Sequence, residues 1–83
     1  MLGCLGVGAV KPADVRFRIR EIQRFAAIDD EAAHEREDAL RAAVLRTISE
    51  MSAHAIAEDA EVVQALCRLA FSTRRIKFRR WCA

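Results

Sequence analysis

Three side chains of types that bind metal ions lie at helical spacing near the middle of the sequence. They are Glu31, His34 and Asp38, and residues 31–34 match the E-x-x-H unit of di-iron helix bundles. That architecture needs the unit twice together with two further glutamates, and this chain contains it once. The sequence therefore disfavours a metal-dependent enzyme, and no cofactor is expected.

The densest group of charged side chains is the C-terminal stretch, where cations alternate with large apolar residues. The cations are Arg74, Arg75, Lys77, Arg79 and Arg80, and the apolar residues are Ile76, Phe78 and Trp81. Cations bind phosphates, while aromatic rings stack on bases or insert into protein pockets. Two alternatives to binding a partner stay open. The apolar side chains could fold back onto a small core, and the arginines could pair with acids elsewhere in the chain.

The formal net charge of +2 conceals an uneven distribution of charge along the sequence. Residues 1–28 carry a net charge of +3, residues 29–61 carry −7, and residues 62–83 carry +6 with no acid. Arg16, Arg18 and Arg20 offer a second group of cations near the N-terminus. An asymmetry of this kind bears on the choice of partner and not on the fold.

Covalent catalysis has no visible basis in the sequence. The three cysteines, Cys4, Cys67 and Cys82, are odd in number, have no metal-ligand spacing and lack a histidine in a catalytic motif. A chain of 83 residues also has little room for a deep, dry pocket. These features disfavour an enzyme, and the cysteine pattern is typical of a reducing compartment such as the cytoplasm.

The elements that position these residues are predicted to be helices. Pro12 suits the first turn of a helix, and the apolar residues that follow it predict a helix over 12–27. Those residues are Val15, Ile19, Ile22 and Ala26. Residues 15–20 also alternate as a half-buried strand would, but the alternation stops at Glu21 and no hairpin partner is near.

A second helix is predicted over 30–51, with Asp29 or Asp30 as its N-cap. Its apolar stripe consists of Ala33, Leu40, Val44, Ile48 and Met51. The opposite face collects Glu31, Glu35, Asp38 and Arg46. Glu37 lies at the edge of the stripe, where an ion pair with Arg41 four residues later would satisfy it.

A third helix is predicted over 59–71, with Asp59 as its N-cap and a wide apolar stripe. The stripe consists of Val62, Ala65, Leu66, Leu69 and Ala70. Cys67 is expected to be a small core residue beside it. Residues 52–57 lack a clear period, and the tail over 72–83 fits either a short helix or an extended segment.

The sequence therefore predicts an all-α, three-helix domain over 12–83, preceded by a flexible apolar leader over 1–11. The leader lacks a cationic region and is too short to span a bilayer, so neither a signal peptide nor a membrane anchor is expected. A homodimer with a shared core is an alternative to a monomer, because three short helices bury little apolar surface.

Two blocks of the sequence resemble a family of short, uncharacterised bacteriophage and prophage proteins. Residues 29–40 match its D-x-E-A-A-H-x-x-E-D-x-L stretch, and residues 78–83 match its terminal F-x-R-W-C-A. Lys77 departs from the family, in which an acid is common at that position. The resemblance covers about residues 20–83 and implies a cytoplasmic accessory protein in a bacterial host, without catalytic residues to transfer.

Two binding functions follow from these features. The first is a non-enzymatic protein that binds and modulates a host protein or nucleoprotein complex, for example a counter-defence inhibitor such as an anti-CRISPR protein. The second is a nucleic-acid-binding protein whose basic tail contacts phosphates, with the acidic middle turned away. The first would use Glu31, Glu35, Asp38, Phe78 and Trp81, and the second would use Arg74, Arg75, Lys77, Arg79 and Arg80.

Overall fold

The computed structural model describes residues 9–78, which form four α-helices and one short 3₁₀-helix and contain no strand. The α-helices are α1 (Pro12–Ala26), α2 (Asp30–Ser49), α3 (Ala53–Glu58) and α4 (Ala60–Ser72), and the 3₁₀-helix is η2 (Thr73–Arg75). The expected all-α fold is confirmed. The three long helices lie where the sequence predicts helices, whereas the short helix α3 is not predicted from the sequence.

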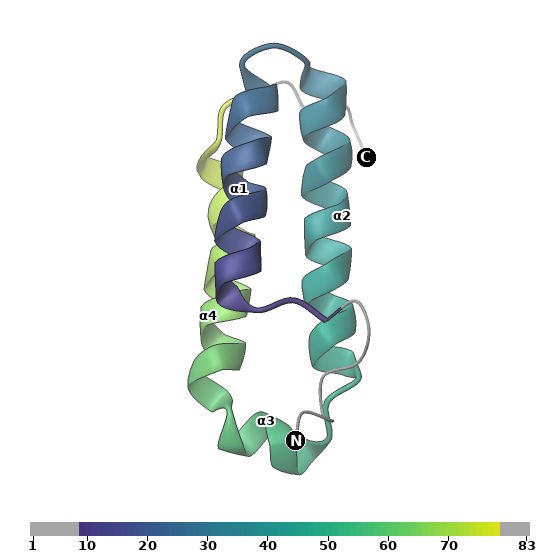
Figure 1. Ribbon diagram of the computed structural model, residues 1–83, viewed down its shortest axis with the longest axis vertical. Helices are drawn as coiled ribbons and strands as arrows, with labels where there is room; N and C mark the ends of the chain where they lie inside the picture. The colour runs from purple at the N-terminus through teal and green to yellow at the C-terminus, as the bar shows by residue number, and fades with distance from the viewer. Residues whose placement is uncertain (1–8, 79–83) are drawn as a thin grey trace.

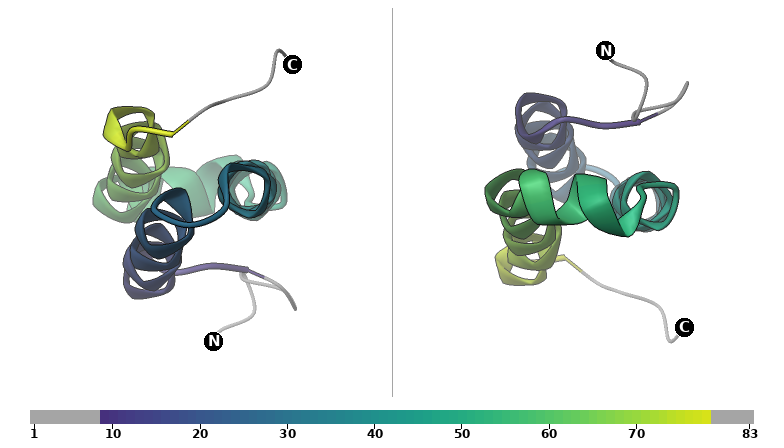
Figure 2. Two further views of the ribbon diagram at one scale, coloured as in Figure 1. Left: turned by 90° about the horizontal axis from the view of Figure 1, so that it is seen from above. Right: turned by 90° about the horizontal axis from the view of Figure 1, so that it is seen from below.

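The three long helices run side by side along the long axis of the molecule (Figure 1). Seen from either end, α1, α2 and α4 occupy the corners of a triangle, and α3 crosses beneath from α2 to α4 (Figure 2). The chain rises through α1, descends through α2 and rises again through α4. The C-terminal ends of α1 and α4 therefore lie at the same end of the molecule as the N-terminal end of α2.

Local sequence signals explain where the first two long helices begin. Pro12 occupies the first turn of α1, where its missing N–H costs no hydrogen bond, and the Lys11 N–H donates to the Asp14 carboxylate at 3.1 Å. Asp29 caps α2 as predicted, because its Oδ1 accepts hydrogen bonds from the N–H groups of Glu31 (3.1 Å) and Ala32 (3.2 Å). The strand alternative for residues 15–20 is wrong.

The core lies between the three long helices. Its buried residues are Val10, Val15, Ile22, Ala33, Leu40, Val44 and Leu66. Ile19, Ala26, Ile48, Leu69 and Ala70 pack partly buried around them. The apolar stripes predicted for 12–27 and 30–51 thus face the core. In the third stripe Val62 is 43% exposed, so only part of that stripe faces the core.

The packed domain begins before residue 12. Val10, placed by the sequence analysis in the leader, is buried in the core, and its N–H donates to Thr47 Oγ1 of α2 at 3.0 Å. Thr47 in turn donates to the Ala43 carbonyl at 2.8 Å. This buried hydroxyl thus accepts one hydrogen bond and donates another, and it holds the chain before α1 against α2.

The short helix α3 has a local cause that hydrophobic periodicity does not reveal. Ser52 is its N-cap, and the Ser52 Oγ accepts a hydrogen bond from the Ala55 N–H at 3.0 Å. Ala55 is buried, and α3 turns the chain from α2 into α4. Asp59 precedes α4 as predicted, but its side chain makes no capping hydrogen bond.

Candidate functional site

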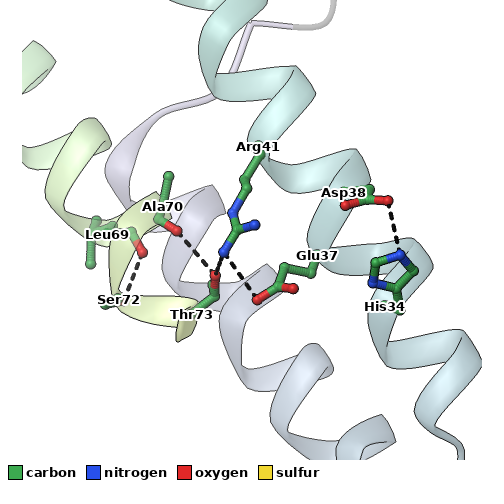
Figure 3. Close-up of polar contacts among 8 residues, drawn as sticks. All are labelled: His34, Glu37, Asp38, Arg41, Leu69, Ala70, Ser72 and Thr73. Atoms are coloured by element: carbon green, nitrogen blue, oxygen red, sulfur yellow. Dashed lines mark hydrogen bonds and ion pairs between the residues drawn. The ribbon is translucent and has the colours of Figure 1, made fainter. Parts of the chain in front are cut away.

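A buried polar cluster fixes the start of the C-terminal segment against α2. Arg41 Nη2 lies 3.3 Å from Glu37 Oε2 and donates to Thr73 Oγ1 at 3.1 Å (Figure 3). Thr73 itself donates to the Ala70 carbonyl at 3.1 Å. Glu37 and Thr73 are both buried. The contact between Arg41 and Glu37 confirms the ion pair predicted from the sequence. The cluster sets the position of η2 and of its two cations, Arg74 and Arg75.

The apolar side chains after η2 turn inward. Ile76 and Phe78 are partly buried and pack against the core, in line with the alternative that the tail folds back onto it. The chain after η2 is neither helical nor part of a strand through Phe78. Trp81, Arg79 and Arg80 lie outside the described residues. Phe78, expected as a partner-binding residue, thus contributes to the domain's own packing.

A first hollow lies between α1 and the C-terminal end of α4. It encloses about 530 Å³ and is lined by Ile19, Gln23, Ala26, Ala27, Ser72, Arg75, Ile76 and Lys77. Its lining combines apolar side chains with the polar and cationic groups of Gln23, Ser72, Arg75 and Lys77. Both exposed cations also lie beyond the last turn of α4, where the helix dipole favours positive charge.

A second hollow adjoins the first and shares two of its residues, Ser72 and Arg75. It encloses about 550 Å³ and is lined by Arg68, Phe71, Ser72, Arg74 and Arg75. The Arg74 guanidinium lies over the Phe71 ring, 5.1 Å from its centroid, which is within the range of a cation–π contact. Neither hollow has an acid among its lining residues.

Three of the arginines of α1, which are Arg16, Arg18 and Arg20, do not form one patch, which corrects the grouping expected from the sequence. Positions 16, 20, 23 and 27 recur at spacings of 4, 3 and 4, so Arg16 and Arg20 extend the stripe that lines the first hollow. Arg18 instead lines a separate hollow of about 180 Å³ beside Glu21 and Arg36, between α1 and α2. Residues two apart on a helix point about 200° apart.

We call the exposed cations around the two joined hollows the basic face. Arg68, Arg75 and Lys77 line the hollows, and the helical period places Arg16 and Arg20 on the adjoining side of α1. Arg74 lies at its edge, and these cations come from α1, α4, η2 and the residues that follow. The basic face therefore exists only in the folded domain, since α1 and α4 are separated by more than thirty residues.

The expected acidic residues lie apart from the basic face. Glu31, Glu35 and Asp38 are all exposed on the N-terminal half of α2, and we call them the acidic end of α2. Asp38 Oδ2 lies 3.3 Å from His34 Nε2, on the side of α2 away from Glu37 (Figure 3). Within residues 9–78 the ion pairs are His34–Asp38, Glu37–Arg41 and His54–Glu58, so none joins this acidic end to the basic face.

The candidate metal ligands do not assemble into a site. His34 and Asp38 approach each other, but no group of three His, Cys, Asp or Glu side chains within residues 9–78 is placed to hold a metal ion. Cys67, expected in the core, is exposed. It lies about 100° around α4 from the buried Leu66, which places it at the exposed edge of the contact with α2.

None of the described helices combines the length and the apolar character needed to cross a bilayer. Compared with protein-family models, curated proteins and solved structures, the chain matches none of them.

Proposed function

We propose that this chain is a non-enzymatic binding protein whose basic face binds the phosphate backbone of a nucleic acid. The observation that carries the proposal is the convergence of exposed cations from α4, η2 and the residues after it around two joined hollows that no acid lines. Arg75 is central to it because it borders both hollows. Phosphate contacts supply most of the affinity of sequence-independent nucleic-acid binding.

The dimensions of the basic face suit a phosphate backbone. Arg68 and Arg75 are seven residues apart, which corresponds to about 10 Å along a helix, or roughly three phosphates of rise on one DNA strand. Lys77 lines the first hollow, and Arg16 and Arg20 extend the positive surface along the adjoining side of α1. The exposed acids of α2 lie elsewhere, so a polyanion on the basic face would meet little repulsion.

Removing two cations from the basic face should weaken nucleic-acid binding and make it less sensitive to salt. We expect Arg75→Ala with Lys77→Ala to lower affinity for duplex DNA or RNA about tenfold or more at low salt. Each lost phosphate contact should reduce the slope of log affinity against log salt by about 0.9 on DNA, so the slope should fall by about 2. Fluorescence anisotropy with a labelled duplex at several salt concentrations measures both quantities.

The matched control removes two cations from outside the basic face. Arg18→Ala with Arg46→Ala gives the same net charge, and we expect it to change affinity less than about twofold. An equal loss in both double variants would show that only total charge matters and would contradict a defined face. Absence of measurable binding of the unaltered chain at about 50 mM salt would remove the proposal.

A second candidate function rests on the acidic end of α2. Its three carboxylates are exposed on one helix and lack an ion pair with the basic face within residues 9–78, so they are available to a basic groove on a protein. The resemblance to phage proteins supports a host protein or nucleoprotein complex as the partner. A counter-defence inhibitor is the most specific form of this proposal, with carboxylates in place of phosphates.

Charge reversal tests this second candidate. We expect Glu31→Lys with Glu35→Lys to abolish capture of a defined host protein from nuclease-treated lysate, because like charges then oppose each other in the contact. Circular dichroism should show an unchanged helical content, since both side chains are exposed. If the double variant captures the host protein undiminished, the proposal that these carboxylates take the place of phosphates is overturned.

A further inference from the structure

The face formed by α2 and α4 carries large apolar side chains that the fold leaves uncovered. Leu45 and Phe71 are 68% and 65% exposed. They border a hollow of about 230 Å³ lined by Arg41, Val44, Leu45, Cys67, Ala70 and Phe71. Arg41 is the one charged residue among the lining side chains. A contiguous apolar surface of this kind is typical of an interface.

One end of this face carries a pair of opposite charges. Asp38 precedes Leu45 by seven residues, or two helical turns, so both project from the same side of α2. On α4, Arg74 follows Phe71 by three residues and lies over its ring. The Arg41–Thr73 hydrogen bond of 3.1 Å brings these parts of α2 and α4 to about the same height. Within the described chain Asp38 is paired with His34 and not with a cation of α4.

We propose that this face binds a second copy of the same chain through a two-fold axis parallel to the helices. That symmetry places α2 of each copy against α4 of the other. Leu45 then covers Phe71 and Cys67 of the second copy, and Asp38 meets Arg74 of the second copy. Because a two-fold contact is self-complementary, each of these contacts forms twice. The apolar hollows are covered and the opposite charges meet in a single arrangement.

The size of the face indicates a weak dimer. Helices of 20 and 13 residues are about 30 Å and about 20 Å long, and two packed helices present a face of roughly 20 Å in width. Each copy would bury on the order of 500 Å², at the low end for specific contacts. Arg75 and Lys77 line the first hollow beside α1, so the dimer would leave that hollow accessible. Phe71 and Arg74 line the second hollow, so the dimer would cover part of it.

Sedimentation of the full chain without nucleic acid tests this proposal separately from nucleic-acid binding. Between about 5 and about 500 μM we expect the weight-average mass to rise from that of a monomer toward that of a dimer. Leu45→Asp should raise the dissociation constant about tenfold or more, because it places a carboxylate in the apolar contact. Ile28→Asp is the matched control: Ile28 is 78% exposed outside this face, and we expect less than a twofold change.

Exchanging the charges of Asp38 and Arg74 tests whether the two-fold axis runs parallel to the helices. Asp38→Arg and Arg74→Asp should each weaken the dimer, because each leaves like charges opposed twice per dimer. The chain that carries both substitutions should recover the dissociation constant of the unaltered protein within about threefold. Failure of the double variant to recover would overturn the parallel arrangement.

Two results would overturn the dimer itself. The first is a full chain that remains monomeric up to about 500 μM. The second is a monomer in which Leu45→Asp shifts the emission of Trp81 toward longer wavelength. That shift would assign the α2–α4 face to residues 79–83 of the same chain.

Discussion

Leu40→Ala is expected to reduce the free energy of unfolding by about 3–4 kcal/mol, because it opens a cavity where α1, α2 and α4 meet. Leu40 has no solvent exposure and belongs to the buried cluster that includes Val15, Ile22 and Leu66. In a domain of this size each 1 kcal/mol corresponds to roughly 4–8 °C, so the melting temperature should fall by about 12–30 °C. Urea unfolding followed by circular dichroism at 222 nm measures the change.

Leu45→Ala provides a control in the same helix with the same chemical change. Leu45 is largely exposed, so at about 2 μM, where self-association is minor, the substitution should cost less than about 0.5 kcal/mol. A comparable loss of stability in both variants would contradict the placement of Leu40 at the centre of the bundle. The contrast between two leucines five residues apart therefore tests the orientation of α2.

Arg41→Met is expected to lower the free energy of unfolding by about 2 kcal/mol. It keeps most of the aliphatic stem but removes the ion pair with the buried Glu37 and the hydrogen bond to Thr73. Removing one partner of a buried ion pair usually costs about 3–5 kcal/mol, and the partial exposure of Arg41 reduces that figure. Chemical denaturation at neutral pH measures the effect.

The companion variants separate charge from packing. Arg46→Met removes an exposed arginine from the same helix, and we expect a change within about 0.5 kcal/mol. Combining Glu37→Leu with Arg41→Met should recover much of the lost stability, because an apolar pair of similar volume replaces a desolvated ion pair at little cost. If the double variant is less stable than Arg41→Met, the Glu37 carboxylate is stabilised in the fold by groups other than Arg41.

The long helices follow from local sequence signals. Asp29 has the chemistry of an N-cap, and the spacing of Leu40, Val44 and the other apolar residues of α2 matches the helical period, so the element and its buried face could both be predicted. The same reasoning identified Glu37 and Arg41 as a pair, because residues four apart on a helix are neighbours. These features depend on one element at a time.

The features that sequence reasoning missed depend on two elements at once. Val10 is buried because Thr47, thirty-seven residues later, offers its N–H an acceptor. Thr73 joins Glu37 and Arg41 only after α4 has packed beside α2. The helix α3 has six residues, too few to display an amphipathic period, although Ser52 is a recognisable cap in retrospect.

The candidate site could be predicted only in part, because its cations come from more than one element. A run of cations in the sequence predicts Arg74, Arg75 and Lys77 as candidate binding residues, and all three line the joined hollows. The run alone does not separate Arg16 and Arg20, on the adjoining side of α1, from Arg18. That division depends on which side of α1 faces α4. Cys67 was assigned to the core because it is small and apolar, but the helical period places it beside the core and not within it.

The separation of the basic face from the acidic end of α2 also affects how this molecule would meet a partner. Opposite charges on different sides of an elongated particle give it an electric dipole. A polyanion would exert a torque on that dipole at separations of about one Debye length, close to 8–10 Å at physiological salt. The basic face would then turn toward the polyanion before contact, so a larger share of diffusional encounters would arrive in a productive orientation.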